Sequence, residues 1–200
     1  MDQLNISGLE AIIGASYGGL VGLSFREIFP DKLKKLIVIS AGHRSHPMAR
    51  GWRHIQRQIM DLVGDLDDDR KRRGIALARA LAMTSYRTPD EFEVRFRHDD
   101  VIDYLEARGR DYSEKVNAEC YYTLSESIDL HNIDPSPNEV KTHIIGFWED
   151  RLVPSSILKE LAEKTQGSLH IHSSLFGHDA FLKEIDLLWE LLPRFLGGRI

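Results

Sequence analysis

A serine, an aspartate and a histidine in this 200-residue sequence have the types and the chain order that acyl transfer needs. Ser16 lies in GASYG, residues 14–18, which matches the G-x-S-x-G turn that exposes a nucleophilic serine between a strand and a helix. A serine hydroxyl is a weak nucleophile, so it needs a base to take its proton and a carboxylate to orient that base. Asp150 and His178 follow in the order that this turn requires, and we expect the three to form a catalytic triad.

Each member of this set also has an ordinary structural interpretation. The serine alone could be a small residue in a Gly-rich bend. Asp150 could begin a loop or pair with Arg151, and the neighbouring Glu149 is a competing acid. His178 could be a loop histidine ahead of a helix-capping Asp179. The triad is favoured because residue type, position after a strand and chain order agree at all three sites.

The segments around these residues predict strands that alternate with helices. Four apolar segments without alternation are typical of strands that are covered on both faces, and they lie at residues 9–15, 36–40, 142–148 and 168–172. Helices are expected between or after these strands, at residues 18–29, 154–164 and 179–195. The pattern predicts an α/β fold with a parallel sheet, and the carboxyl ends of parallel strands share one edge. The three candidate residues should therefore meet at that edge.

A helical region interrupts this α/β pattern. Residues 47–131 change to helical periodicity and contain no strand pattern, so we divide the chain into an α/β core, residues 1–46 and 132–200, and a helical insertion. Within the insertion the charged stretch DLDDDRKRR, residues 65–73, is expected to be a solvated loop and helix start rather than a binding patch.

Charge and composition argue against several classes of function. The net charge of −5 leaves no basic excess for nucleic acid. Cys120 is the only cysteine, so no internal disulfide can form, and a reducing compartment, the cytoplasm, is expected. No segment approaches the roughly 20 apolar residues that span a bilayer, so no membrane partner is expected. His43, His46 and His54 lack carboxylate partners at metal-ligand spacing, so we expect no metal site and expect these histidines to line the mouth of the cleft.

The sequence resembles the homoserine O-acyltransferases of the α/β-hydrolase superfamily, which make O-acetyl- or O-succinylhomoserine for methionine synthesis. The segments that carry the resemblance are GASYGGLVGLSF, GIALARALAMTSYRTPDEFEVRF, SESIDLH, EDRLVP and FGHDAFLKE. Many hydrolases share the serine turn, whereas its combination with HDAFL, residues 178–182, is specific to this family. The resemblance implies an α/β-hydrolase fold with a helical lid insertion that also forms a homodimer.

The resemblance also implies a ping-pong reaction with an acyl-serine intermediate. The triad serine would attack an acyl-CoA thioester, and the hydroxyl of homoserine would then take the acyl group. Acyl-CoA is a cosubstrate in this scheme, and no cofactor stays bound. By resemblance Arg79 would bind the α-carboxylate of homoserine, Asp179 its α-ammonium, and Tyr86 would help to position it. From the residues alone, Arg79 could instead be an exposed charge on a helix, and Asp179 a cap.

Residues 40–58, SAGHRSHPMARGWRHIQRQ, resemble the succinyl-CoA branch of the family more than the acetyl-CoA branch. Their cationic side chains could meet a succinyl carboxylate, so succinyl transfer is favoured over acetyl transfer. Two alternatives stay open. The chain could be a serine esterase or thioesterase that uses water in place of homoserine, or a non-enzymatic fragment that retains only the helical dimerisation region.

Family members carry further strands before the serine turn, whereas here the strand before Ser16 lies within the first dozen or so residues. We expect an N-terminally truncated sheet whose first strand is an exposed apolar edge, which pairs with another chain or aggregates. The N–H of Tyr17 can supply one oxyanion donor, and the family's second donor comes from the missing part. Loss of one such donor costs on the order of 100- to 1,000-fold in rate.

Overall fold

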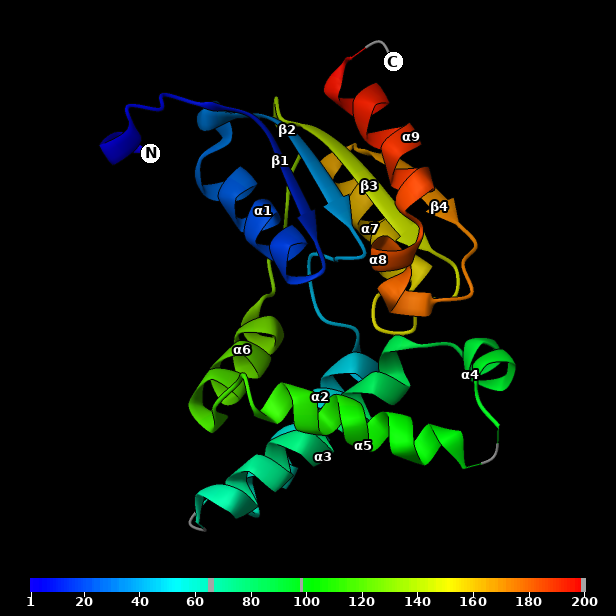
Figure 1. Cartoon of the computed structure of the whole chain (residues 1–200). Helices are drawn as coiled ribbons and strands as arrows, with labels where there is room; N and C mark the ends of the chain where they lie inside the picture. Colours follow the sequence, from blue (N-terminus) through cyan, green and yellow to red (C-terminus); the bar gives the residue numbers. More distant parts are fainter. Residues whose placement is uncertain (65–66, 98, 199–200) are drawn as a thin grey trace.

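The computed structural model describes residues 1–64, 67–97 and 99–198 (Figure 1). These residues form one parallel sheet in the order β1-β2-β3-β4, with strands β1 (Leu9–Ala15), β2 (Leu33–Ile39), β3 (Lys141–Phe147) and β4 (Ser168–His172). All four expected strands are present. The second begins three residues earlier than the apolar pattern indicates, because Leu33 is buried and pairs in register with Leu9.

Helices connect and follow the strands. The longer ones are α1 (Tyr17–Ile28), α2 (Pro47–Asp61), α3 (Asp68–Tyr86), α4 (Pro89–Arg95), α5 (Asp100–Ser113), α6 (Ala118–Leu130), α7 (Ser155–Thr165) and α9 (Ile185–Leu196). Shorter pieces are η1 (Asp2–Leu4), η2 (Pro30–Lys32), η3 (Gly177–Asp179) and α8 (Ala180–Lys183). The expectation of one final helix over residues 179–195 is wrong. The backbone of Glu184, at φ −87° and ψ 56°, leaves the helical region and separates α8 from α9.

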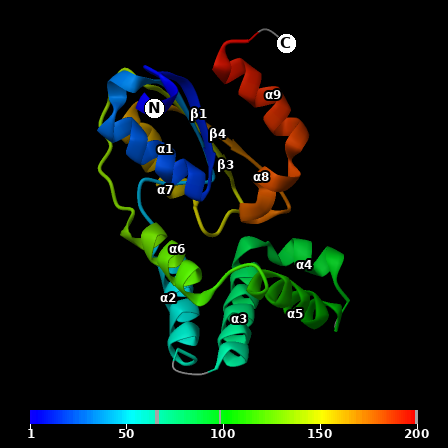
Figure 2. The same cartoon turned by 60° about the vertical axis from the view of Figure 1, so that its left-hand side comes forward.

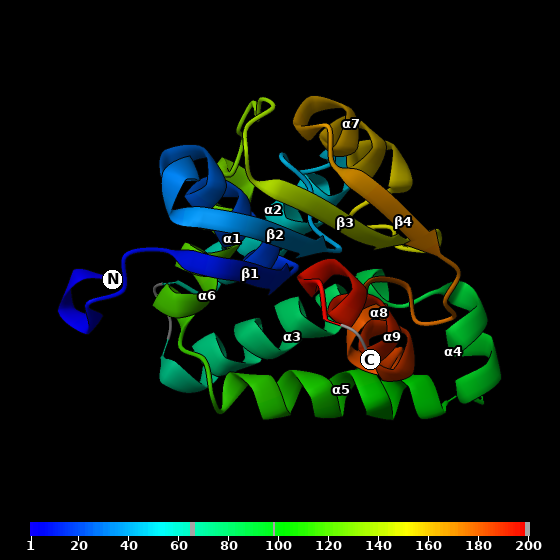
Figure 3. The ribbon, with the colours of Figure 1, turned by 90° about the horizontal axis from the view of Figure 1, so that it is seen from above.

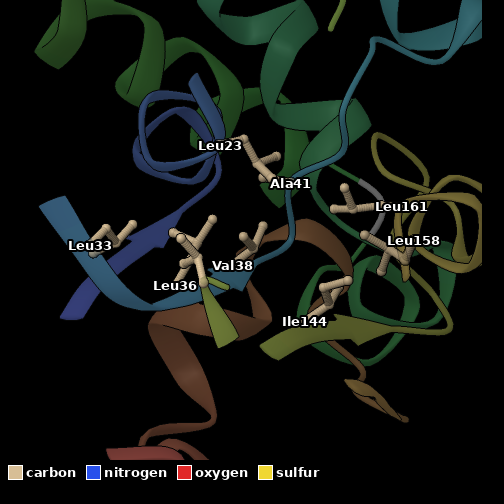
Figure 4. Packing of buried hydrophobic residues seen from close by; sticks show 9 residues of the cluster. Leu23, Leu33, Leu36, Val38, Ala41, Ile144, Leu158 and Leu161 are labelled. Atoms are coloured by element: carbon tan, nitrogen blue, oxygen red, sulfur yellow. The ribbon is translucent and has the colours of Figure 1, made fainter. Parts of the chain in front are cut away.

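Helices cover both faces of the sheet, which explains why its strands show no polar alternation. Val38 of β2 packs with Leu23 of α1 and Leu158 of α7 on one face (Figure 4). The residue before Val38, Ile37, faces the other side of the sheet and packs with Leu191 of α9. The view from above shows the strands side by side, with β1 and β4 outermost (Figure 3).

The helices α2 to α6 form a separate layer beyond the carboxyl ends of the strands (Figure 2). A small core of its own includes Met60, Ile75, Ala78 and Tyr121. Asp65 and Leu66 of the charged stretch lie outside the described residues. The rest of that stretch opens α3, whose first turn is capped by Asp67: its carboxylate accepts a hydrogen bond from the N–H of Arg70 at 2.9 Å.

The chain leaves the sheet after β2 and returns to it before β3 through two adjacent segments. Arg44 forms an antiparallel bridge with Asn132, and the N–H of Ile133 donates to the carbonyl oxygen of His43 at 3.0 Å. The helical layer is therefore attached to the sheet by a short two-stranded neck.

β1 is the outermost strand of the described sheet and pairs with β2 alone. The side chain of Ile13, near its centre, is 46% exposed. The expectation that the strand before Ser16 is an apolar edge agrees with this arrangement. Among the residues that the structure describes, no helix has the length and apolar character needed to cross a lipid bilayer.

Candidate active site

Ser16 occupies a tight turn between β1 and α1. Its φ of 47° and ψ of −117° are strained for a residue with a side chain, and its N–H donates to the carbonyl oxygen of Ile39 at 2.8 Å. The turn brings Gly14 against the first turn of α1, where a Cβ on Gly14 would lie 2.2 Å from the carbonyl oxygen of Gly18. The hydroxyl of Ser16 is thus held at the carboxyl edge of the sheet.

The structure brings Ser16, His178 and Asp150 into one hydrogen-bonded chain. The hydroxyl of Ser16 lies 2.9 Å from Nε2 of His178, and Nδ1 of His178 lies 2.8 Å from Oδ2 of Asp150. Oδ1 of Asp150 accepts from the N–H groups of Leu152 and Val153 at 2.9 and 3.0 Å. These bonds fix the carboxylate, which then selects the tautomer in which Nδ1 is protonated and Nε2 is free to accept the proton of Ser16.

Glu149, the competing acid, faces elsewhere. Its carboxylate accepts a hydrogen bond from the N–H of Ser174 at 2.9 Å, and the hydroxyl of Ser174 in turn donates to Glu184 at 2.7 Å. Glu149 thus braces the loop that follows β4, whereas Asp150 contacts the imidazole.

His178 is 6% exposed, and Asp150 is 3% exposed. Burial lowers the pKa of His178, but the charge and hydrogen bond of Asp150, with a smaller contribution from Asp179, outweigh burial and raise it above its usual 6.5. The imidazole therefore stays protonated to a higher pH than a free histidine does.

This shift predicts the pH dependence of Ser16. Only the neutral imidazole can accept the serine proton, so the reaction of Ser16 with a fluorophosphonate should slow as the pH falls, with a midpoint above 6.5. The measurement is the labelling rate between pH 5 and 9, with Ser16→Ala as the blank. A midpoint below 6.5 would contradict the pairing of His178 with Asp150.

Ser16 and His178 open into a cavity of about 160 Å³ between the sheet edge and the helical layer. Arg79 and Tyr86 of α3 line the same cavity. The Arg79 guanidinium lies 5.2 Å from the ring centre of Tyr86 and 4.7 Å from that of Tyr112, an arrangement in which each ring face attracts the cation. No carboxylate among the described residues pairs with Arg79, so its charge is available to a ligand.

Asp179 is not among the residues that line this cavity. Its Oδ2 lies 2.9 Å from Nε of Arg87 in a largely buried ion pair. Asp179 occupies the N-cap position of α8, but its side chain makes no capping hydrogen bond there. Tyr17 is the first residue of α1, so its N–H has no carbonyl partner within the helix, and Tyr17 lines the cavity together with Ser16.

The three histidines after β2 do not line the cavity, so the expectation that they do is wrong. His43 turns inward, is 2% exposed and lies 3.2 Å from Glu160. His46 accepts a bond from the N–H of Met48 as the cap of α2, and His54 is exposed on the surface of that helix. Within the described ranges, no three ligand-type side chains are grouped as a metal ion would require.

A cationic wall on α2 is the feature that sequence reasoning did not resolve. Arg53 donates to Oδ1 of Asp129 at 2.6 and 2.9 Å and to the hydroxyl of Ser45 at 2.8 Å. Arg57 donates to Oδ2 of the same aspartate at 2.8 Å. Two guanidinium groups thus share one buried carboxylate, and Arg53 lines the cavity. The cationic stretch of residues 40–58 was a signal for this wall, but its pairing with Asp129 was not visible in the sequence.

The sheet, its helices and the position of the serine turn define an α/β-hydrolase fold. Esterase E22 superimposes with a TM-score of 0.85 at 16% identity, covering 98% of this chain and 63% of the esterase. The homoserine O-acetyltransferase of Staphylococcus aureus superimposes with a TM-score of 0.81 at 26% identity, covering 98% of this chain and 60% of that enzyme. No protein-family model matches the sequence.

In sequence the chain is homologous to the homoserine O-acyltransferases. It is 43% identical to the homoserine O-succinyltransferase of Xanthomonas campestris, over 98% of this chain and 56% of the relative. It is 32% identical to the homoserine O-acetyltransferase of Thermus thermophilus, over 98% of this chain and 55% of the relative. The chain therefore spans about half the length of the curated relatives that it matches.

Proposed function

We propose that this chain carries the acyl-transfer site of a homoserine O-acyltransferase, which moves an acyl group from CoA to the hydroxyl of homoserine. The observation that carries the proposal is one cavity with a nucleophile at one side and an unpaired cation at the other. The hydrogen-bonded chain of Ser16, His178 and Asp150 opens into it, and the guanidinium of Arg79 lines it.

In the first half-reaction, Oγ of Ser16 attacks the thioester carbonyl carbon while Nε2 of His178 takes the hydroxyl proton. The carbonyl oxygen becomes an oxyanion, and the N–H of Tyr17, the first residue of α1, donates a hydrogen bond to it. Collapse of this tetrahedral intermediate breaks the carbon–sulfur bond, and CoA leaves as a thiol with the proton from His178. Asp150 stabilises the imidazolium throughout, and Ser16 is left as an ester.

In the second half-reaction, His178 takes the hydroxyl proton of homoserine, whose oxygen attacks the acyl-serine ester. Collapse releases O-acylhomoserine and returns the proton to Ser16. Arg79 matches the α-carboxylate with its planar fork, and Tyr86 forms part of the same wall. That Asp179 binds the α-ammonium stays a prediction, because its Oδ2 faces Arg87 and Asp179 does not line the cavity.

We favour succinyl-CoA as the donor over acetyl-CoA. The more similar of the two relatives described above is named as an O-succinyltransferase, at 43% against 32% identity. Arg53 also places positive charge on the cavity wall, where the free carboxylate of a succinyl group would be attracted and an acetyl group would gain nothing.

The product of this reaction fits methionine synthesis, and the exposed free thiol of Cys120 fits a reducing compartment such as the cytoplasm. Dimerisation through α2 to α6 is supported by apolar side chains that the helical layer leaves exposed, which include Ile55, Leu62 and Leu77.

The test is CoA release from succinyl-CoA or acetyl-CoA with and without homoserine. Loss of thioester absorbance is the suitable signal, because the exposed Cys120 would itself react with thiol reagents. We expect release that depends on homoserine, is faster with succinyl-CoA and is absent in Ser16→Ala. Release that homoserine does not accelerate would indicate a thioesterase. No release, together with no fluorophosphonate label on Ser16, would contradict an acyl-transfer site in this chain.

Arg79→Ala is expected to raise the KM for homoserine about 10- to 100-fold, because hydrogen bonds to a charged group contribute roughly 1.5–3 kcal/mol. Acylation of Ser16 by the donor alone should change little. The matched control is Arg72→Ala on the same helix, whose side chain is 62% exposed outside the cavity. If Arg79→Ala and the Arg72→Ala control have the same KM for homoserine, Arg79 does not bind the substrate.

A further inference from the structure

The turn that carries His178 is docked on the junction between α3 and α4. The hydroxyl of Thr88 donates to the carbonyl oxygen of Leu175 at 2.5 Å and accepts from the N–H of Glu91 at 3.0 Å. Gly177, at φ 58°, passes so close to the junction that a Cβ there would lie 2.9 Å from the carbonyl oxygen of Tyr86. The loop immediately before His178 therefore packs directly against the helical layer.

An ion pair holds the other side of the same turn. Nε of Arg87 lies 2.9 Å from Oδ2 of Asp179, the residue after His178, without the angle of a hydrogen bond. On its far side Arg87 contacts Oε1 of Glu91 at 3.5 Å, and Arg95 contacts the same oxygen at 3.1 Å. The side chains of Arg87 and Glu91 are only 8% and 5% exposed, so water screens this row of charges little.

We propose that Arg87 is a positioning residue for the base: it holds the Asp179 carboxylate against the α3–α4 junction and so fixes the turn that presents His178 to Ser16. Arg87 does not line the cavity and acts only through Asp179. This assignment rests on the proposed function, since it concerns the same His178.

The electrostatic reason is that Asp179 and Asp150 both place negative charge beside His178, and Arg53 of α2 is a cation that acts in the opposite direction. Tyr86 of α3 packs its ring 5.9 Å from that of His178. Arg87 compensates the charge of Asp179 and keeps this carboxylate from turning towards the imidazole. Without Arg87, an unpaired and largely buried anion remains next to His178.

The first test is an NMR titration of the His178 imidazole nitrogens in the full chain, assigned with His178→Gln, because it needs no catalytic turnover. In Arg87→Gln the uncompensated Asp179 charge should move the His178 midpoint to higher pH. Arg87→Lys keeps the charge and should restore the midpoint. The control Arg95→Gln removes a half-exposed cation that contacts Glu91 but not Asp179, and it should leave the midpoint unchanged. An unchanged or lower midpoint in Arg87→Gln overturns the proposal.

The second test is the fluorophosphonate labelling rate of Ser16, measured at a pH where His178 is neutral in every variant. Displacement of a catalytic group by about 1 Å can cost on the order of 100-fold, so we expect a loss of about 10- to 100-fold in Arg87→Gln. If that variant does not fold, Arg87→Lys decides: slower labelling at the normal midpoint supports positioning, and the unmodified rate overturns it. Loss of labelling in every form, the unmodified chain included, would reject the proposed function, while the titration still decides the role of Arg87.

Discussion

Asp150→Asn should lower the rate of Ser16 acylation by about 1,000- to 10,000-fold. An amide at this position has no second anionic oxygen and offers an N–H where the imidazole needs an acceptor. His178 would then adopt the other tautomer or turn away, and Nε2 would no longer accept the proton of Ser16. Donor thioester loss and fluorophosphonate labelling both measure this rate.

Glu149→Gln is the matched control for that variant. The two acids are neighbours in sequence, yet Glu149 contacts Ser174 and not His178. We expect a labelling rate within a few-fold of the unmodified chain. Equal losses in the two variants would show that the Asp150 carboxylate contributes general negative charge rather than a specific hydrogen bond to Nδ1 of His178.

Gly14→Ala is expected to lower the free energy of unfolding by about 3 kcal/mol and to displace the serine turn. The new methyl group would lie 2.2 Å from the carbonyl oxygen and 2.4 Å from the carbonyl carbon of Gly18, and 2.7 Å from the nitrogen of Gly19. These are backbone atoms of α1, which cannot rotate aside as a side chain can. Denaturant unfolding measures the stability, and Ser16 labelling measures the turn.

Gly18→Ala, at the other glycine of the same motif, should have the opposite outcome. A Cβ there meets nothing within 4 Å, and alanine favours a helix over glycine by up to about 1 kcal/mol. We expect unchanged or slightly higher stability and normal labelling. If both glycines prove equally intolerant, the steric account of the turn is wrong.

These two glycines illustrate how far the sequence could be interpreted. The motif treats Gly14 and Gly18 alike, because a pattern records residue types and not the distance between a strand and the following helix. The grouping of Ser16, Asp150 and His178 was predictable for a different reason: each of them follows an apolar strand, and parallel strands end at one edge. The local sequence pattern and the residue types point to the same three positions, so no contact between distant segments has to be known to predict the grouping.

What the sequence could not reveal depends on contacts between distant segments. Arg87 and Asp179 are far apart in the chain, and neither has a local pattern that predicts an ion pair. The shared carboxylate of Asp129 is another such case. His43 was expected at the cleft mouth, but its ring turns inward to Glu160, a residue of α7 that no pattern near His43 indicates.

The candidate site is formed by two parts of the chain, the α/β core and the helical layer, which the two-stranded neck after β2 connects. Ser16, His178 and Asp150 lie at the sheet edge, whereas Arg79, Tyr86 and Arg53 lie on helices inserted between β2 and β3. Substitutions in the inserted helices can therefore change the wall of the cavity while the hydrogen-bonded chain of Ser16, His178 and Asp150 stays the same. The α3–α4 junction is the exception, because a change there alters both at once.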